Sequence, residues 1–276
     1  MSTAQNNTAD FMADTYSQAC EPLNLVGASQ AWFANEYHCH NQSSKKAALI
    51  LGGTPWLTNL CMANHQDVHL MDMSKKMLEF TQTDSTHAES KIHHHCMNWT
   101  SISALESEFD TVCGDNSFAF IPKECWQDFI HDLSTKMSTG SVLISRFFSV
   151  PDMYTPMSRA DLIRHYRPHK KINFTEMRCR MMFTGLNIDD FEIDTNNVID
   201  QYVANISEYQ LVSEDTKIES TLLNDVLKYK DTNIKLFVPR VNKITELLSP
   251  YFQLIKVTYG SYGMSDFFPL VIATRR

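Results

Sequence analysis

The stretch Ala47-Ala48-Leu49-Ile50-Leu51-Gly52-Gly53 runs five apolar residues into a pair of glycines. A second, mainly apolar run, Val68-His69-Leu70-Met71, ends at Asp72, twenty residues after Gly52. A strand that leads into a glycine turn brings bare backbone close to a ligand, and an acid at the tip of the next parallel strand can accept hydrogen bonds from ribose hydroxyls. The pattern therefore predicts a nucleoside site at the carboxyl edge of a parallel sheet.

The turn that follows the first strand, Gly52-Gly53-Thr54-Pro55-Trp56-Leu57, indicates what kind of nucleoside fits. A dinucleotide fingerprint needs three glycines and a helix N-terminus whose N–H groups hold a pyrophosphate. Here Thr54 and Leu57 replace the second and third glycines, and Pro55 removes one N–H donor. The chain also lacks a Gly-x-x-x-x-Gly-Lys-Ser/Thr loop for nucleoside triphosphates. A ligand without phosphate is favoured, and S-adenosylmethionine is the common adenosine ligand of that kind.

Four segments, in order, resemble motifs of the class I S-adenosylmethionine-dependent methyltransferases of the small-molecule type. The four segments are residues 49–57, 70–74, 96–99 and 109–117. The first resembles a variant motif in which Gly-x-Thr-Pro replaces Gly-x-Gly, and the second resembles the motif whose acid, here Asp72, binds the ribose. The resemblance covers residues 45–150 well and extends to the C-terminal strands by topology. It departs from the family at Ile50, where an acid is frequent, so the contact made by that acid is absent.

The resemblance implies a set of cofactor-binding residues. They are Gly52, Gly53, Thr54, Asp72, Met73, Asn98, Trp99, Gly114 and Asp115. Asp72 would bind the ribose, and Asn98, in place of the more frequent Asp, would accept from the adenine amine with Trp99 packed beside the ring. Asp115 would lie near the methionine moiety or the substrate.

Each of these residues also has a structural interpretation. The two glycines fit an ordinary strand-to-helix turn, Asp72 fits a helix N-cap, and Asn98 with Trp99 fits a turn followed by a core aromatic residue. Asp115 begins an Asp-Asn-Ser sequence that is typical of turns. Asp72 and Ser74 can divide the two roles, because Ser74 can cap the helix while Asp72 points at the ribose.

The length and charge of the chain restrict its class. A chain of 276 residues, with net charge 24 − 32 = −8, fits one catalytic domain with an added helical part. No basic cluster is longer than residues 167–171, which argues against a nucleic acid partner. The polar N-terminus and the absence of a long apolar run predict a cytoplasmic protein without a membrane partner. Seven cysteines without a Cys-x-x-Cys pair indicate reduced thiols, and a homodimer is possible.

Strand and helix patterns alternate through the middle of the chain and predict an α/β, Rossmann-like, doubly wound sheet of seven strands with an antiparallel last strand. The expected strands are 47–51, 67–71, 92–96, 109–114, 140–147, 251–258 and 267–274, and the expected core helices are 55–64, 74–82, 124–138 and 239–248. We expect a helical N-terminal cap over residues 1–44, with helices at 11–20 and 29–40, and the cofactor-binding core over 45–150. Residues 151–237 form an expected helical insertion after the fifth strand that shapes the substrate pocket, with helices near 159–166, 172–184, 196–208 and 216–229. Residues 238–276 supply the closing helix and the last two strands.

Candidate catalytic residues follow from the chemistry of methyl transfer. Attack on a sulfonium mainly requires alignment and exclusion of water, and a hydroxyl or ammonium acceptor also needs a base. The candidates are Tyr37, His38, Tyr154 and His165, and the sequence does not rank them. The run His93-His94-His95 predicts no metal site, because alternation along a strand sends His94 to the opposite face.

The function predicted from the sequence is methyl transfer from S-adenosylmethionine to a small molecule. One alternative keeps the cofactor but attacks its aminocarboxypropyl or aminopropyl carbon, or cyclises it, with methylthioadenosine as the product. Another is a catalytically silent cofactor-binding partner protein. A nicotinamide oxidoreductase is less favoured because of Pro55.

Overall fold

The computed structural model describes residues 22–41, 46–83, 91–158, 161–162, 165, 173–204, 227, 229–230, 232 and 234–276. The helix expected at residues 11–20 lies outside these ranges, and so do most residues of the helices expected near 159–166 and 216–229.

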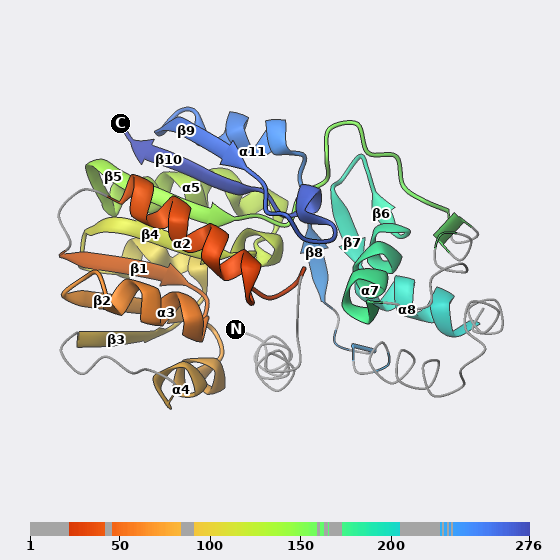
Figure 1. The fold of residues 1–276 in the computed structure, drawn as a ribbon, viewed down its shortest axis with the longest axis horizontal. Coiled ribbons are helices and arrows are strands. Elements are labelled where there is room, and N and C mark those ends of the chain that lie inside the picture. The colour runs from red at the N-terminus through yellow and green to blue at the C-terminus, as the bar shows by residue number, and fades with distance from the viewer. Residues whose placement is uncertain are drawn as a thin grey trace.

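The central element is a seven-stranded sheet with the strand order β3-β2-β1-β4-β5-β10-β9 (Figure 1). Its strands are β1 (Ala47–Leu51), β2 (Asp67–Asp72), β3 (Lys91–Cys96), β4 (Phe109–Asp115), β5 (Met137–Arg146), β9 (Phe252–Thr258) and β10 (Leu270–Arg275). Strands β1 to β5 pair in parallel, whereas β10 runs antiparallel to both β5 and β9. The predicted seven-stranded doubly wound sheet with an antiparallel last strand is confirmed.

Helices cover both faces of this sheet. Figure 1 shows α2 (Ala28–His40), α3 (Pro55–Met62) and α4 (Lys75–Thr83) on the near face, and α5 (Trp126–Thr135) and α11 (Val241–Leu248) behind it. Alternate residues of a strand point to opposite faces, so Ala48 and Ile50 of β1 pack in one apolar cluster and Leu49 and Leu51 in the other. Burial on both faces explains why β1 is apolar at every position.

An insertion follows β5, as the sequence predicts, but it is not purely helical. It contains α7 (Phe174–Phe183), α8 (Thr195–Ala204) and a three-stranded antiparallel sheet of β6 (Leu186–Asn187), β7 (Glu192–Asp194) and β8 (Lys235–Phe237). Strands of two or three residues are too short to show a period of two, which is why the sequence pattern indicated helices alone. The insertion has its own apolar cluster, which also contains Phe148, Phe267 and Phe268 from the segments next to β5 and β10.

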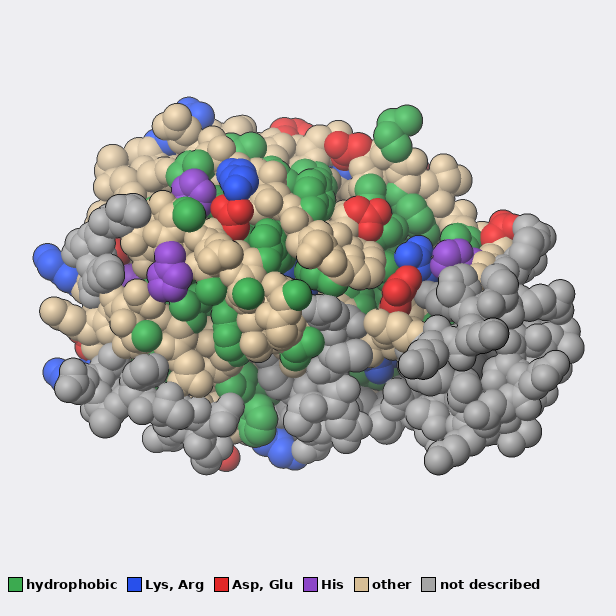
Figure 2. Space-filling view, in the orientation of Figure 1, with side chains coloured by type: hydrophobic (Ala, Val, Ile, Leu, Met, Phe, Trp, Pro, Cys, Tyr) green, Lys and Arg blue, Asp and Glu red, His purple; other side chains and the backbone are tan. Residues whose placement is uncertain are grey.

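Charged side chains of both signs are mixed on the face of the molecule drawn in Figure 2. On the face drawn in Figure 2, Lys and Arg side chains are scattered among acidic and apolar ones rather than gathered in a stripe. In the part of the chain that the structure describes, no helix combines the length and the apolar character needed to cross a membrane.

Three histidines stack at the β2–β3 edge of the sheet. His69 of β2 lies parallel to His95, with ring centroids 5.1 Å apart, and nearly parallel to His93, at 4.4 Å. His69 Nδ1 and His95 Nε2 are 2.9 Å apart and share a hydrogen bond. Burial, with the nearby His93 and His95, lowers the pKa of His69 from 6.5 to about 4.

This stack predicts loss of stability in mild acid. The native state resists protonation of His69 until about pH 4, whereas the unfolded chain takes up the proton near pH 6.5, so the free energy of unfolding falls as pH drops through this window. We expect a loss of about 2 kcal/mol between pH 7 and pH 4.5 that is attributable to His69. Urea unfolding at a series of pH values measures it. His69→Gln should flatten the profile, whereas His131→Gln, at an exposed histidine on α5, should not. Identical profiles for the two variants would contradict the assignment.

Candidate functional site

In the glycine turn after β1, every backbone N–H group of residues 52–54 is hydrogen-bonded within the protein. Gly52 N donates to Met71 O at 2.9 Å, Gly53 N to Asp72 Oδ2 at 2.9 Å, and Thr54 N to Gly52 O at 3.1 Å. The next residue, Pro55, begins α3 and has no N–H. Residues 52–55 therefore offer no backbone donor for a phosphate.

The two glycines are required for different reasons. Gly52 has φ +104°, a conformation that residues with a side chain rarely adopt. At Gly53 the constraint is space, because a Cβ would lie 3.0 Å from Met77 Cγ and 3.1 Å from Thr81 Oγ1. Gly53 thus lets α4 approach the turn closely.

Asp72 ends β2 beside this turn, and two backbone bonds orient its carboxylate. Oδ2 accepts from Gly53 N at 2.9 Å and Oδ1 accepts from Ser74 N at 2.8 Å. Ser74 Oγ accepts from Met77 N at 3.0 Å and so caps α4 itself. The cap at Ser74 agrees with the predicted division of roles, and the ribose contact of Asp72 stays a prediction.

Trp99 and Asn98 follow β3 and border the same space. Trp99 Nε1 donates to Met71 O at 2.6 Å, which fixes the indole beside the glycine turn. Asn98 Oδ1 accepts from Thr100 N at 3.0 Å and from Thr100 Oγ1 at 2.9 Å. The oxygen expected to receive the adenine amine is thus occupied as the cap of a 3-10 helix, Trp99–Ala104. An adenine contact from Asn98 requires that this cap open, or that another atom of the residue make it.

A buried ion pair closes the end of β4. Arg146 Nε at the end of β5 donates to Asp115 Oδ1 at 2.5 Å, and both side chains are almost completely buried. Burial lowers the pKa of Arg146, but the adjacent Asp115 carboxylate more than offsets this, so the net pKa is raised. The guanidinium also donates to Pro22 O at 2.9 Å, to Leu23 O at 3.0 Å and to Tyr262 Oη at 3.1 Å. Arg146 therefore anchors the segment before α2 and the loop before β10 to the strand ends.

The two residues after Asp115 complete the turn. Asn116 has φ +60°, in the left-handed region that Asn tolerates better than most residues. Its Nδ2 donates to Leu23 O at 3.4 Å, while for its buried Oδ1 the described part of the chain offers no hydrogen-bond partner. Ser117 Oγ donates to Leu51 O and so ties this turn to the end of β1.

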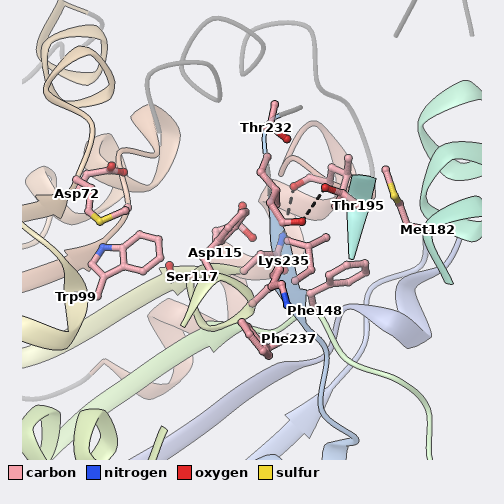
Figure 3. Close-up of a pocket in the computed structure, with 18 of the residues that line it drawn as sticks. Asp72, Trp99, Asp115, Ser117, Phe148, Met182, Thr195, Thr232, Lys235 and Phe237 are labelled. Atoms are coloured by element: carbon pink, nitrogen blue, oxygen red, sulfur yellow. Dashed lines mark hydrogen bonds between the residues drawn. The ribbon is translucent and has the colours of Figure 1, made fainter. Parts of the chain in front are cut away.

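These strand ends form one side of a cavity of about 620 Å³ whose other side is the insertion (Figure 3). Asp72 and Trp99 lie at one end, Lys235, Thr195 and Met182 lie at the other, and Asp115 lies between them. Of the predicted cofactor residues, the cavity is lined by Gly52, Gly53, Thr54, Asp72, Met73, Asn98, Trp99 and Asp115. Gly114 does not line it. A Cβ there would meet Ser145 Oγ at 2.8 Å, so Gly114 serves the packing of β4 against β5.

Several residues that line the cavity were not predicted from the sequence. The additional lining residues include Leu23, Asn24, Asn116, Phe148, Met182, Glu192, Lys235, Phe237 and Phe268. Glu192 and Lys235 form an ion pair at 2.7 Å within the β7–β8 sheet. The single Arg inside the apolar run 142–148 was a usable signal, because a buried Arg requires several partners.

The structure does not support the expected catalytic roles on α2. Tyr37 is 1% exposed, packs under the sheet, and shares a hydrogen bond with His65 Nε2 at 2.7 Å. Burial raises the pKa of its hydroxyl well above the ordinary value. His38 lies on the exposed side of α2 and is not a lining residue of the cavity. Helix α2 packs its apolar side on the sheet, and of the described residues before β1 only Leu23 and Asn24 line the cavity.

The other two candidates also lie outside the cavity lining. Tyr154 packs edge-on against Phe183 and Phe267, with centroids 5.7 and 5.0 Å apart, and burial raises the pKa of its hydroxyl. His165 is exposed. No histidine is among the described residues that line the cavity.

The histidine stack has no shape suited to a metal ion. His93 and His95 of β3 each stack on the ring of His69 of β2, and His93 Nε2 pairs with Asp67 Oδ1 at 3.1 Å. Within the described ranges, no group of three or more His, Cys, Asp or Glu side chains could hold a metal.

Comparison with known proteins identifies the fold. No family model matches this chain, and neither does the sequence of any curated protein. Among solved structures, a putative Zn-dependent alcohol dehydrogenase from Rhodobacter sphaeroides has a TM-score of 0.62 at 11% identity over all of both chains. N-methyltransferase NodS from Bradyrhizobium japonicum WM9, in complex with S-adenosyl-L-homocysteine, has a TM-score of 0.53 at 8% identity over 97% of this chain and 98% of its own. Magnesium protoporphyrin IX methyltransferase (ChlM) from Synechocystis PCC 6803, with bound S-adenosylmethionine, has 0.54 at 10% identity over 100% and 99%.

At these identities the similarity concerns the fold. The strand order with β10 inserted antiparallel between β5 and β9, the helix before β1 and the insertion after β5 make it the fold of class I S-adenosylmethionine-dependent methyltransferases.

The hydrogen bonds of Arg146 to Asp115, Pro22, Leu23 and Tyr262 form a buried network, and its loss should lower the free energy of unfolding. Arg146→Met should lower the free energy of unfolding by about 3–5 kcal/mol, because Asp115 and two carbonyls are left buried without their partner. Lys243→Met, which removes an exposed ion pair with Glu246, should change it by less than about 0.5 kcal/mol. Urea unfolding measures both. A loss below about 1 kcal/mol for Arg146→Met would show that the network does not hold the strand ends together.

Proposed function

We propose that this protein binds S-adenosylmethionine and transfers its methyl group to a small-molecule acceptor that enters between the sheet and the insertion. The observation that carries the proposal is the hydrogen bonding of the glycine turn. Its backbone N–H groups donate to Met71 O, to the Asp72 carboxylate and to a carbonyl of the turn itself. Such a turn admits a nucleoside closely but cannot hold a phosphate. Asp72, on the adjacent strand and bordering the same cavity, is placed to accept from ribose hydroxyls.

The cavity has the size and the polarity for two molecules in contact. Pockets of about 300–1,000 Å³ are usual for small ligands, and this one has about 620 Å³. Asp72 and Trp99 at one end suit the adenosine, which places the sulfonium toward Asp115 and the acceptor beside the insertion (Figure 3). Aromatic side chains that line the cavity, such as Phe148 and Phe268, can stabilise a sulfonium through cation–π attraction.

The geometry gives the protein three tasks in the reaction. It must align the acceptor atom, the methyl carbon and the sulfur, exclude water, and leave a path for any proton released. The insertion, through β8 and α7, covers the acceptor end and so serves the first two tasks. A nicotinamide oxidoreductase is disfavoured, because a dinucleotide pyrophosphate would find no donor at residues 52–55.

The ribose assignment predicts the effect of one carboxylate on affinity. Asp72→Ala should weaken binding of S-adenosylhomocysteine at least about tenfold, because each charge-assisted hydrogen bond is worth about 1.5–3 kcal/mol. Asp110→Ala is a matched control, since Asp110 also accepts two backbone N–H groups, from Lys46 and Ala47, but at the opposite end of the strands. Calorimetry of both variants decides. An unchanged dissociation constant for Asp72→Ala, or equal losses in the two variants, would remove the ribose role.

The transferred group predicts which nucleoside is released. Methyl transfer yields S-adenosylhomocysteine, whereas attack on the aminocarboxypropyl carbon, or cyclisation, yields methylthioadenosine. We expect S-adenosylhomocysteine, formed only when small-molecule extract is added, as measured by mass spectrometry. Release of methylthioadenosine above the uncatalysed background would contradict methyl transfer and would favour attack on the aminocarboxypropyl carbon or cyclisation. Binding of the cofactor without either product would favour a silent cofactor-binding protein.

A further inference from the structure

Two neighbouring residues that line the cavity, Asp115 and Asn116, each carry an oxygen acceptor for which no hydrogen bond is found among the described residues. Asp115 Oδ1 is taken by Arg146, which is its only hydrogen-bond partner in the described part of the chain, so Oδ2 is left for a ligand. The next residue, Asn116, is 9% exposed, and its Oδ1 has no hydrogen-bond partner among the residues that the structure describes. A buried acceptor without a donor costs about 1–3 kcal/mol, which a bound molecule with N–H groups would recover.

The charge at this point is balanced. Arg146 neutralises Asp115, so the pair does not hold a cation as an isolated carboxylate would. An amine that enters this buried place is favoured in its neutral form, because burial disfavours a charged ammonium. A neutral amine has the lone pair that attack on a methyl group requires.

No histidine, the usual base for a hydroxyl acceptor, lines the described part of the cavity. The lining carboxylates include Glu192, which is paired with Lys235, Asp115, which is paired with Arg146, and the exposed Glu124. A hydroxyl must lose its proton during attack, whereas a neutral amine attacks first and loses a proton afterwards.

We propose that the acceptor is an amine with an apolar, aromatic-sized body, whose N–H groups bond to Asp115 Oδ2 and Asn116 Oδ1; this inference rests on the proposed methyl transfer. Phe148, Phe268 and Met182 supply the apolar surface for the body of the molecule.

The reaction balances as follows. The ammonium gives one proton to solvent on entry, and the nitrogen lone pair then forms a bond to the methyl carbon. The carbon–sulfur bond breaks with its electron pair moving to sulfur, which loses its positive charge. The product is an N-methyl ammonium, and its extra proton passes to the Asp115 carboxylate and on to solvent. Burial raises the pKa of that carboxyl, which suits it to receive the proton.

The first test uses 2-phenylethylamine and 2-phenylethanol as matched probes with methyl-tritiated S-adenosylmethionine. We expect label transfer to the amine to be at least about tenfold faster than to the alcohol, and to rise with pH as the ammonium loses its proton. Asn116→Gly, which keeps the left-handed backbone without the amide, should slow transfer at least about tenfold. Asn116→Asp, which restores an acceptor oxygen, should retain most of the rate. Equal or faster transfer to the alcohol, or no effect of Asn116→Gly, would overturn the proposal.

A second arm separates the acceptor amine from the amino group of the cofactor. If Asn116 binds the cofactor instead, Asn116→Gly should weaken binding of S-adenosylhomocysteine but not of methylthioadenosine, which lacks the amino acid. We expect neither dissociation constant to change, and a loss confined to S-adenosylhomocysteine would overturn the acceptor role.

A third arm uses small-molecule extract treated with N-hydroxysuccinimidyl acetate, which acylates amines. Label transfer should be lost after treatment and present before it. Transfer that survives acylation would overturn the amine while leaving methyl transfer in place. No transfer with untreated extract, although the cofactor binds, would overturn methyl transfer and the amine together.

Discussion

The ion pair between Arg146 and Asp115 is the interaction on which the site depends. It joins the ends of β4 and β5, and through carbonyls of residues 22–23 it also fixes the segment that enters the cavity before α2. The same guanidinium lies 5.2 Å from the ring centroid of Phe268 and bonds to Tyr262, so the loop before β10 is held as well. A charge with this many partners is stable inside a protein only when all of them are in place.

The parallel arrangement of the strands explains why the other groups of the site lie close together. In a parallel sheet the carboxyl ends of the strands meet at one edge, so the turn after β1, the acid after β2 and the turn after β4 become neighbours. Local hydrogen bonds then orient these groups. Gly53 N donates to the Asp72 carboxylate, Trp99 Nε1 donates to Met71 O, and Ser117 Oγ donates to Leu51 O. The insertion supplies the opposite wall of the cavity.

Several polar residues that suggest chemistry in the sequence have structural roles in the fold. Tyr37 belongs to a buried chain of hydrogen bonds in which His65 bonds to Tyr37 and Asn41, and Thr111 donates to Asn41. Asn98 caps a 3-10 helix, and the histidines of β3 stack against His69. Such residues satisfy buried polar groups of the fold, and only their neighbours in space reveal it.

The sequence by itself determined the sheet, the position of the glycine turn and the acid at the tip of β2. These depend on local signals: apolar runs long enough to be strands, glycines that permit φ +104° or close packing, and a proline that begins a helix. Tertiary structure alone decided that Arg146 and Asp115, thirty-one residues apart, form a buried pair, and that α2 packs on the sheet. It also decided that β8, far along the chain, completes the cavity with Lys235 and Phe237. Contacts of this kind arise from packing between distant segments, and no local period or motif records them.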